Sequence, residues 1–354
     1  METLQKKLKK VSMTKPLFIV GTRPEIIKVS SLVNKINCNV LFTGQHFDKA
    51  MSEFFFKLIK KAPLINLEGT NYRNKNWGGF TDDIKIQIKK IGPSTVIVQG
   101  DTNTTLYGAV AAKSLGLKIN YIESGMRSGD VTQIEEFNRI VVAGLASKNF
   151  CNHINNQKAL IKEGVTPDKT MVSGSTVYSV LESNNLLKYK EKNNDKFILL
   201  TLHRPENVDN AKNLSALLNA INSLGIKIKF ITHPRVFNSE NHQSLKLFNN
   251  IEVLKPCEYF KFVELIKKSL FIISDSGGIQ EESAILGKPL LIPRNFTERP
   301  EMLNIYNLLV NNITDLEKEA ISLINGDSEI QKIDNNKLLY GRSEVVDLIL
   351  NNII

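Results

Sequence analysis

The chain has 354 residues, 42% of them hydrophobic and 23% charged, which is ordinary for a globular protein with room for two domains. Its apolar runs are far shorter than the roughly 20 residues of a membrane-spanning helix, so we expect neither a membrane span nor a secretory signal. The net charge of +10 suits a phosphorylated ligand, whereas the lack of a basic run interleaved with aromatic residues argues against nucleic acid. The three cysteines are scattered, with no CxxC pair and no histidine cluster, so we expect no bound metal and a reducing, cytoplasmic setting.

Apolar runs in the first half of the chain predict four strands, at residues 16–20, 39–43, 94–98 and 118–122. The turn after the first strand holds Arg23, and Pro24 begins a helix that carries Lys28. Gln45 and His46 follow the second strand. Because open α/β sheets bind ligands where the carboxyl ends of their strands meet, we expect these side chains to gather at one edge. Surface cations are the plain alternative for Arg23 and Lys28.

Acidic residues follow the next two strands. Asp101 ends the third strand and Glu123 the fourth, while Glu135 opens a helix that also carries Arg139. Such carboxylates often only cap a helix or complement its dipole. Two of them at one sheet edge, beside cationic turns, also suit general acid–base chemistry. Further elements of this half are predicted as helices at 77–91, 106–115, from 157 and from 176, and as short strands near 149–151 and 171–172.

A polar linker at 186–196 is followed by a second alternation of strands and helices. Strands are predicted at 197–201, 226–231, 251–254, 270–273 and 289–293, and closing helices near 315–324 and 343–353. The first two of these strands lead to His203 and His233, and Phe262 lies on the helix after the third.

The fourth strand of this series ends in Ser274-Asp275-Ser276-Gly277-Gly278, which opens a helix carrying Glu282. Unpaired amides and the helix dipole attract an anion to such a helix start, and glycine lets a diphosphate approach the backbone closely. Glu282 can accept hydrogen bonds from ribose hydroxyls. The turn at Ser276, Gly277 and Gly278 therefore predicts a nucleotide diphosphate site, with an ordinary βα turn as the alternative.

The repeated alternation predicts an α/β protein with two Rossmann-like parallel-sheet domains facing across a cleft. We expect a basic extension at 1–14, a first domain with the carboxylates at 15–185, and the linker at 186–196. A nucleotide-binding domain is expected at 197–335, and a helix within 336–354 is expected to pack back on the first domain.

The ordered set of polar turns resembles the non-hydrolysing UDP-N-acetylglucosamine 2-epimerases. The matching stretches are Gly21–Glu25 with Lys28, Thr43–His46, Gly100–Thr102 with Thr104 and Thr105, Glu123–Arg127, Glu135–Glu136 with Asn138 and Arg139, His203–Arg204 with Glu206, His233, Ser274–Glu282 and Thr297–Glu301. They follow the family's order from residue 17 to about residue 301, which is most of the chain.

The resemblance implies the GT-B fold, a homodimer without cofactor or metal, and interconversion of UDP-GlcNAc and UDP-ManNAc. In that family UDP leaves to give 2-acetamidoglucal and adds back after C2 regains its proton on the other face. By position, the resemblance implies catalytic roles for Asp101, Glu123, Glu135 and His203. It implies UDP-sugar contacts for Arg23, Lys28, Arg139, His233, Phe262, Ser276, Gly277, Gly278 and Glu282, and a candidate regulatory second site at Gln45 and His46.

Three features depart from the family pattern. The loop between Arg127 and Glu135 is short, residues 142–144 replace an Asp-His pair, and residues 340–343 lack a Gly-Asp-Gly motif after the tyrosine. The near alternative is therefore the same chemistry on another UDP-2-acetamido sugar, 6-deoxy or uronic, although residues 126–129 stay closer to the GlcNAc type. A GT-B glycosyltransferase would use the same UDP turn without needing three carboxylates, and a nucleotide-sugar sensor would bind without turnover.

Overall fold

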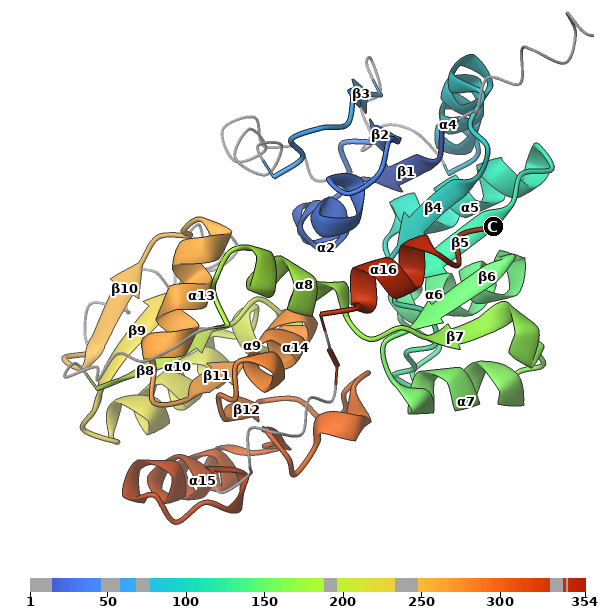
Figure 1. Cartoon of the computed structure of the whole chain (residues 1–354). Helices are drawn as coiled ribbons and strands as arrows, with labels where there is room; N and C mark the ends of the chain where they lie inside the picture. Colours follow the sequence, from blue (N-terminus) through green and yellow to red (C-terminus); the bar gives the residue numbers. More distant parts are fainter. Residues whose placement is uncertain are drawn as a thin grey trace, which may run out of the picture. The chain divides into compact units, whose positions relative to one another are not determined.

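The computed structural model describes residues 15–45, 58–67, 77–187, 196–232, 248–331, 340–341 and 343–354. The chain divides into two compact units, the first comprising residues 1–180 and 342–354 and the second residues 181–341. Each unit is built on its own sheet (Figure 1). The linker expected at 186–196 stays a prediction, because most of it lies outside the described residues.

The first unit holds a seven-stranded parallel sheet in the order β3-β2-β1-β4-β5-β6-β7. Its strands are β1 (Leu17–Val20), β2 (Asn39–Phe42), β3 (Leu64–Asn66), β4 (Val96–Gln99), β5 (Ile119–Ile122), β6 (Lys148–Cys151) and β7 (Thr170–Val172). Its helices are α2 (Arg23–Val33), α4 (Trp77–Ile91), α5 (Asn103–Ser114), α6 (Ile134–Leu145), α7 (Ile154–Lys162) and α16 (Val345–Leu350), with a 3-10 turn, η2 (Pro167–Lys169), before β7. Helix α8 (Thr176–Ser183) crosses the division between the units.

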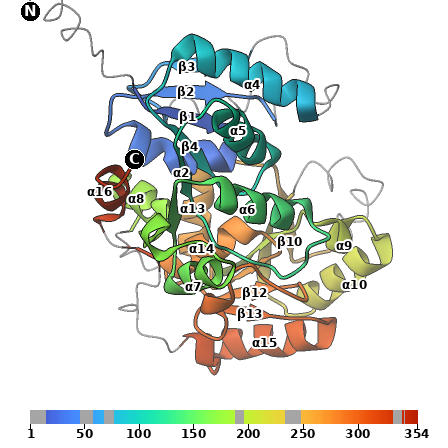
Figure 2. The same cartoon turned by 90° about the vertical axis from the view of Figure 1, so that its right-hand side faces the viewer.

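The central strands of this sheet are apolar on both faces because both faces are covered. Every residue of β1 and β4 is buried, as parallel sheets require when helices lie on either side. Helices α4, α5 and α6 lie side by side along one face (Figure 2) and contribute to a single core cluster with the strands. The apolar runs thus specify the strands, and the polar residues are left for the strand ends.

The second unit repeats this plan with six parallel strands in the order β10-β9-β8-β11-β12-β13. Its strands are β8 (Phe197–Thr201), β9 (Lys227–Ile231), β10 (Ile251–Leu254), β11 (Ile272–Ser274), β12 (Leu290–Ile292) and β13 (Asn307–Leu309). Its helices are α9 (Pro205–Val208), α10 (Ala211–Asn222), α13 (Tyr259–Lys268), α14 (Gly277–Ile285) and α15 (Ile313–Asn325), with 3-10 turns η4 (Pro300–Met302) and η5 (Glu329–Gln331). Alternate residues of β8 join core clusters on opposite faces of the sheet.

The strand order reverses at one place in each sheet, and the candidate residues lie there. Strand β1 sits between β2 and β4, and β8 sits between β9 and β11. Doubly wound sheets bind ligands at the carboxyl ends of the strands beside such a switch point. Arg23 and Asp101 follow β1 and β4, and His203 and Asp275 follow β8 and β11.

The last helix, α16, belongs to the first unit, although 161 residues of the second unit precede it. It contacts α2, drawn in blue beside the red α16 in Figure 1, and Asp347 forms an exposed ion pair with Lys35. At the end of the described chain, the backbone of Ile354 exchanges hydrogen bonds with the side chain of Asn120 on β5.

The predicted strands and helices that fall on described residues are confirmed to within a few residues, with two strands missed. Strands β3 and β13 have three residues each and, unlike the equally short β11 and β12, each includes an asparagine and is not fully buried, so no continuous apolar run identifies it. Helix α7 begins at Ile154, three residues before the predicted start. In the part of the chain that is described, no helix combines the length and the hydropathy needed to span a membrane.

Candidate active site

A buried carboxylate, Glu25, organises the turn after β1. Its Oε2 accepts the backbone N–H groups of Gly21 and Thr22, at 2.6 and 2.8 Å, in the manner of a helix capping box. Its Oε1 accepts the hydroxyl of Thr102, at 2.5 Å, from the turn after β4. Burial raises the pKa of Glu25, and this effect exceeds the lowering that these hydrogen bonds cause. Glu25 therefore joins the two turns at the switch point and supports the start of α2, where Arg23 is half-buried.

Glu123, which follows β5, is held by two side chains from neighbouring elements. The ammonium of Lys28 lies 2.6 and 2.5 Å from its two carboxylate oxygens, and Gln99 donates its amide to Oε2. Lys28 and Glu123 are only 12% and 8% exposed. The backbone of Glu123 is left-handed, with φ of 66°, a conformation that is costly for a non-glycine residue and recurs at functional sites. The tertiary structure thus pairs two of the predicted site residues with each other.

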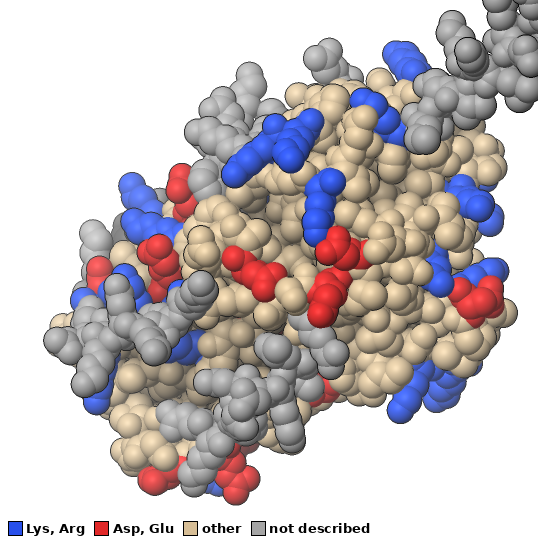
Figure 3. Space-filling model, viewed as in Figure 1, with Lys and Arg blue, Asp and Glu red and all other residues tan. Residues whose placement is uncertain are grey.

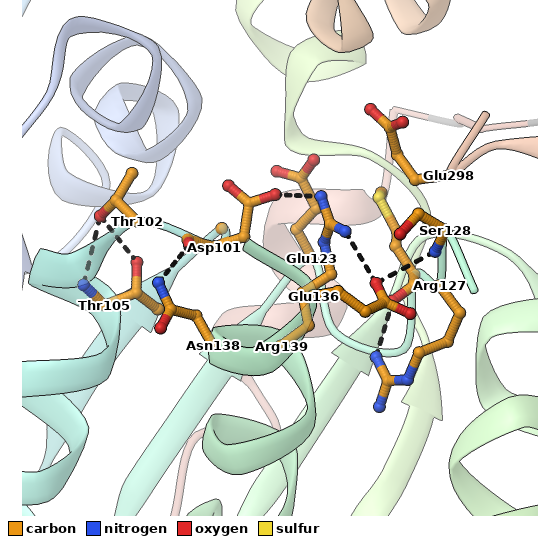
Figure 4. A network of polar contacts seen from close by, with 12 residues as sticks. Asp101, Thr102, Thr105, Glu123, Arg127, Ser128, Glu136, Asn138, Arg139 and Glu298 are labelled. Carbon is orange, nitrogen blue, oxygen red and sulfur yellow. Dashed lines mark hydrogen bonds and ion pairs between the residues drawn. The ribbon is translucent and has the colours of Figure 1, made fainter. Parts of the chain in front are cut away.

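Asp101, which follows β4, forms an ion pair with Arg139 of α6 (Figure 4). Arg139 Nη1 also donates to Glu136 Oε2, at 2.9 Å, and the Glu136 carboxylate accepts the backbone N–H groups of Ser128 and Gly129, at 3.0 and 3.2 Å. Arg139 and Glu136 are almost fully buried, whereas Asp101 is one-third exposed. Asp101 is therefore the member of this network that a ligand can reach, and Arg139 positions it.

The two successive glutamates at the start of α6 have different surroundings. Glu136 is buried against Arg139 and the loop of Ser128, whereas Glu135 is exposed. Successive helical residues point roughly 100° apart, so Glu136 is buried in the network while the side chain of Glu135 stays accessible to solvent. A catalytic role was predicted for Glu135 and none for Glu136, because only the tertiary contacts distinguish two adjacent identical residues.

Gln45, one of the two residues of the candidate regulatory site, lies against the start of α5. Its Oε1 accepts both the backbone N–H and the hydroxyl of Thr104, each at 2.9 Å, and the Thr104 hydroxyl is also 2.7 Å from that of Thr43. Gln45 thus belongs to the polar edge of the first sheet. His46 and His233 lie outside the described residues.

In the second unit, His203 follows β8 and is bound by Asp275, which follows the adjacent strand β11. His203 Nδ1 lies 2.7 Å from Asp275 Oδ1. Asp275 is fully buried, while the imidazole is 37% exposed. A catalytic role was predicted for His203 from the sequence, but none for Asp275. The position of Asp275 directly before the Gly277–Gly278 turn was the signal that could have identified this residue.

The turn after β11 begins α14, with Ser276 as the N-cap and Gly277 and Gly278 as the first helical residues. A Cβ atom on Gly277 would lie 2.1 Å from Glu298 Oε1 and 3.1 Å from Arg299 Nη1. A Cβ atom on Gly278 would meet no described atom within 4 Å. Gly277 is therefore required by the packing behind the turn, whereas Gly278 leaves space beside it.

Glu282 and Phe262 lie on the two helices that flank this turn. Glu282, on α14, is buried, and burial together with the nearby charge of Glu282 raises the pKa of Tyr259 at the start of α13. Phe262 is partly buried against the core cluster of the same sheet face. The carboxylate proposed for the ribose thus lies near a tyrosine that the sequence analysis had not selected.

Basic side chains do not form a continuous stripe on the face drawn in Figure 3. The Lys and Arg residues described there lie in separate groups over both units, with Asp and Glu between several of them. Proteins that bind nucleic acid usually gather their basic residues along one face. On this face the described charges lack that arrangement.

Comparison with known proteins assigns the family. Residues 31–354 match the family model described as UDP-N-acetylglucosamine 2-epimerase. A relative of that name from Methanococcus maripaludis is 38% identical over 312 residues, which cover 81% of this chain and 85% of the relative. A UDP-2,3-diacetamido-2,3-dideoxy-D-glucuronate 2-epimerase from Pseudomonas aeruginosa is 32% identical, covering 92% of this chain and 96% of that protein.

A solved structure extends the likeness to the fold. The crystal structure of Methanocaldococcus jannaschii UDP-GlcNAc 2-epimerase in complex with UDP-GlcNAc and UDP has a TM-score of 0.80 and 32% identity, covering 95% of this chain and 98% of that one. The two Rossmann-like parallel-sheet units are those of a GT-B-like fold, as predicted. On the extent of the family match and the identity of these relatives, this chain belongs to the UDP-N-acetylglucosamine 2-epimerase family.

Proposed function

We propose that the chain is an isomerase that interconverts UDP-GlcNAc and UDP-ManNAc. The observation that carries this proposal is the pair of carboxylates Asp101 and Glu123 at the ends of the neighbouring strands β4 and β5. Each is held by a cation from a different helix, Arg139 or Lys28. Membership of the family and the UDP-GlcNAc complex of the solved relative support the choice of substrate.

The chemistry explains why such residues are needed. C2 of the sugar has no adjacent carbonyl, so its proton leaves only as the C1–O bond to UDP breaks. A base takes the C2 proton, the C–H electrons form the C1=C2 double bond of 2-acetamidoglucal, and UDP departs with the C1–O electrons. The reverse steps deliver a proton to the opposite face of C2 and rejoin a phosphate oxygen to C1. Two acid–base groups and a stabilised leaving group are therefore required.

The predicted site residues divide between these two tasks. In our proposal Asp101, Glu123 and Glu135 of the first unit supply the acid–base groups. Positively charged and amide donors stabilise the departing UDP: Arg23 from the first unit, and His203 with the amides of the Gly277–Gly278 turn from the second. The backbone strain at Glu123 and its tight ion pair fit a group that is held in one orientation before substrate arrives.

Turnover in deuterated water tests this proposal. The purified protein is incubated with UDP-GlcNAc in D2O, and C2 of both sugars is followed by NMR. We expect deuterium at C2 of substrate and product together with new UDP-ManNAc. The absence of both exchange and epimer would refute the function. Asp101→Asn is the matched control, and it should abolish exchange while UDP still binds.

The same chemistry on another UDP-2-acetamido sugar is the remaining alternative within this family. The glucuronate 2-epimerase from Pseudomonas aeruginosa illustrates it, although the Methanococcus UDP-GlcNAc enzyme is more similar to this chain. A panel of UDP-2-acetamido sugars, including 6-deoxy and uronic forms, separates the two. We expect the highest kcat/KM with UDP-GlcNAc. Tight binding of UDP-GlcNAc without exchange would instead indicate a sensor.

We also propose that the enzyme is a homodimer that works in the cytoplasm. The family resemblance supports the dimer, and three large apolar side chains of α6, Ile134, Phe137 and Ile140, are exposed on the described surface. Free Cys38, Cys151 and Cys257 fit a reducing compartment. Light scattering during gel filtration tests the dimer, and fractionation of the cells that make the protein tests its location.

A further inference from the structure

The carboxylate of Asp275 binds the turn that carries His203 through several donors. Oδ1 lies 2.7 Å from His203 Nδ1 and 3.1 Å from the His203 backbone nitrogen. Oδ2 accepts the backbone N–H of Arg204, at 3.1 Å, and the side-chain amide of Asn207, at 2.9 Å. All these donors come from residues 203–207, which follow β8 and run into helix α9. One buried side chain therefore fixes both the backbone and the imidazole of this turn.

The charge of Asp275 decides which nitrogen of the imidazole carries a proton. Burial would raise the pKa of Asp275, but the hydrogen bonds from His203 and Asn207 and the attraction of His203 outweigh it and hold that pKa below its usual range. An ionised carboxylate can only accept hydrogen bonds. His203 Nδ1 must therefore be the donor, and the ring acts on a ligand through Nε2.

The position of Asp275 in the chain links this ring to the Gly277–Gly278 turn. Asp275 lies between β11 and Ser276, and β11 pairs with β8 in parallel register, Ser274 opposite Thr201. The imidazole and the amides of Gly277 and Gly278 consequently emerge from adjacent strand ends of one sheet. The contacts of the Asp275 side chain therefore fix the position of the imidazole relative to these amides.

We propose that Asp275 is a positioning residue that acts through His203, fixing its Nδ1–H tautomer and ring orientation so that Nε2 meets the nucleotide diphosphate beside the Gly277–Gly278 turn. This inference rests on the proposed function for its effect on turnover. When the ring is protonated, Nε2 presents an N–H donor to the departing diphosphate, and the buried anion balances the positive charge. The arrangement serves the leaving group and takes no proton from the sugar.

Asp275→Asn is the decisive substitution, because the amide keeps the size of the side chain while removing its charge and allowing an N–H donor to face Nδ1. We expect kcat to fall by about 100-fold with KM changed by less than about threefold. The nitrogen-15 spectrum of the His203 imidazole should lose the Nδ1–H pattern. Asn207→Ala is the control, since it removes another hydrogen bond to the same carboxylate yet leaves the ring contact; its tautomer should be unchanged and kcat should fall by less than about fivefold.

A double-variant cycle separates positioning from a structural role. If Asp275 acts through His203, then Asp275→Asn combined with His203→Gln should cost no more than His203→Gln alone. Additive losses, or an unchanged imidazole spectrum in Asp275→Asn, would overturn the proposal. Wild-type protein that showed the Nδ1–H pattern and bound UDP but did not epimerise would refute the proposed function and leave the positioning role of Asp275 supported.

Discussion

The ammonium of Lys28 contacts both carboxylate oxygens of Glu123, at 2.6 and 2.5 Å, across the gap between α2 and the end of β5. Both side chains are largely buried. Removing one member of a buried pair leaves the other charged and uncompensated, which costs about 3 kcal/mol or more. The pair therefore contributes to the order of the first unit as well as to the orientation of Glu123.

Lys28→Met should lower the thermal midpoint of unfolding, and it should lower kcat because Glu123 loses the partner that orients it. The exposed pair of Lys35 and Asp347 is the control. Exposed ion pairs contribute less than about 1 kcal/mol, so Lys35→Met should leave both quantities close to wild type. Calorimetry measures the thermal midpoint of both variants. Equal decreases in Lys28→Met and Lys35→Met would show that the buried pair contributes no more stability than the exposed pair.

The adjacent glutamates of α6 should have opposite mutational effects. Glu135→Gln changes an exposed side chain, so we expect an unchanged thermal midpoint and a loss of kcat of about 100-fold, as for removal of an acid–base group. Glu136→Gln leaves buried Arg139 Nη1 and two loop amides with a weaker acceptor, which should cost about 2 kcal/mol of stability. Calorimetry and the deuterium-exchange assay on both variants test this contrast. Loss of activity without loss of stability in Glu136→Gln would contradict it.

Gly277→Ala should weaken UDP binding. The new methyl group would come within 2.1 Å of Glu298 Oε1, and Glu298 cannot move freely because it is paired with both Arg294 and Arg299. Displacement of the turn costs about 1–3 kcal/mol, so we expect UDP affinity to fall by roughly tenfold or more in calorimetric titration.

Gly144→Ala provides the control for this substitution, because its Cβ would meet no described atom within 4 Å and lies in a helix, where alanine is favoured. Its UDP affinity should match that of wild type. An unchanged affinity in Gly277→Ala would mean that the turn can shift without loss of the ligand.

The stability that Asp275 provides should depend on pH in a defined direction. Its pKa in the folded protein is lowered, so its contribution is fully present above the carboxyl group's ordinary pKa, near 3.8, and is lost as the pH falls through the folded value. We therefore expect the difference in thermal midpoint between wild type and Asp275→Asn to be fully present at pH 7 and to shrink as the pH falls below about 4. The exposed Asp347→Asn should show little difference at any pH. A difference in thermal midpoint that grew at acidic pH would contradict the lowered pKa assigned to Asp275.

Much of the molecule could be predicted from local sequence signals. The buried strands of both sheets are apolar runs that end in polar turns, and a parallel sheet brings such turns to one edge, so Asp101, Glu123 and His203 could be selected before any contact was known. The Gly277–Gly278 turn was recognisable because glycine before a helix suits an anion. Strands β3 and β13 were not predicted, because each has only three residues and one of them is an asparagine that interrupts the apolar run.

What the sequence alone determined was which residue types end which strands, because hydrophobic periodicity and turn chemistry are local. Only the tertiary structure decided which of these groups contact one another. Lys28 forms an ion pair with Glu123, which is 95 residues away in the sequence, and Arg139 forms its buried ion pair with Glu136. Asp275 reaches back to His203 from the adjacent strand. Which side chains pair depends on the direction in which each helical residue points and on which strands are neighbours in the sheet. Both are properties of the folded chain, and no local sequence pattern contains them.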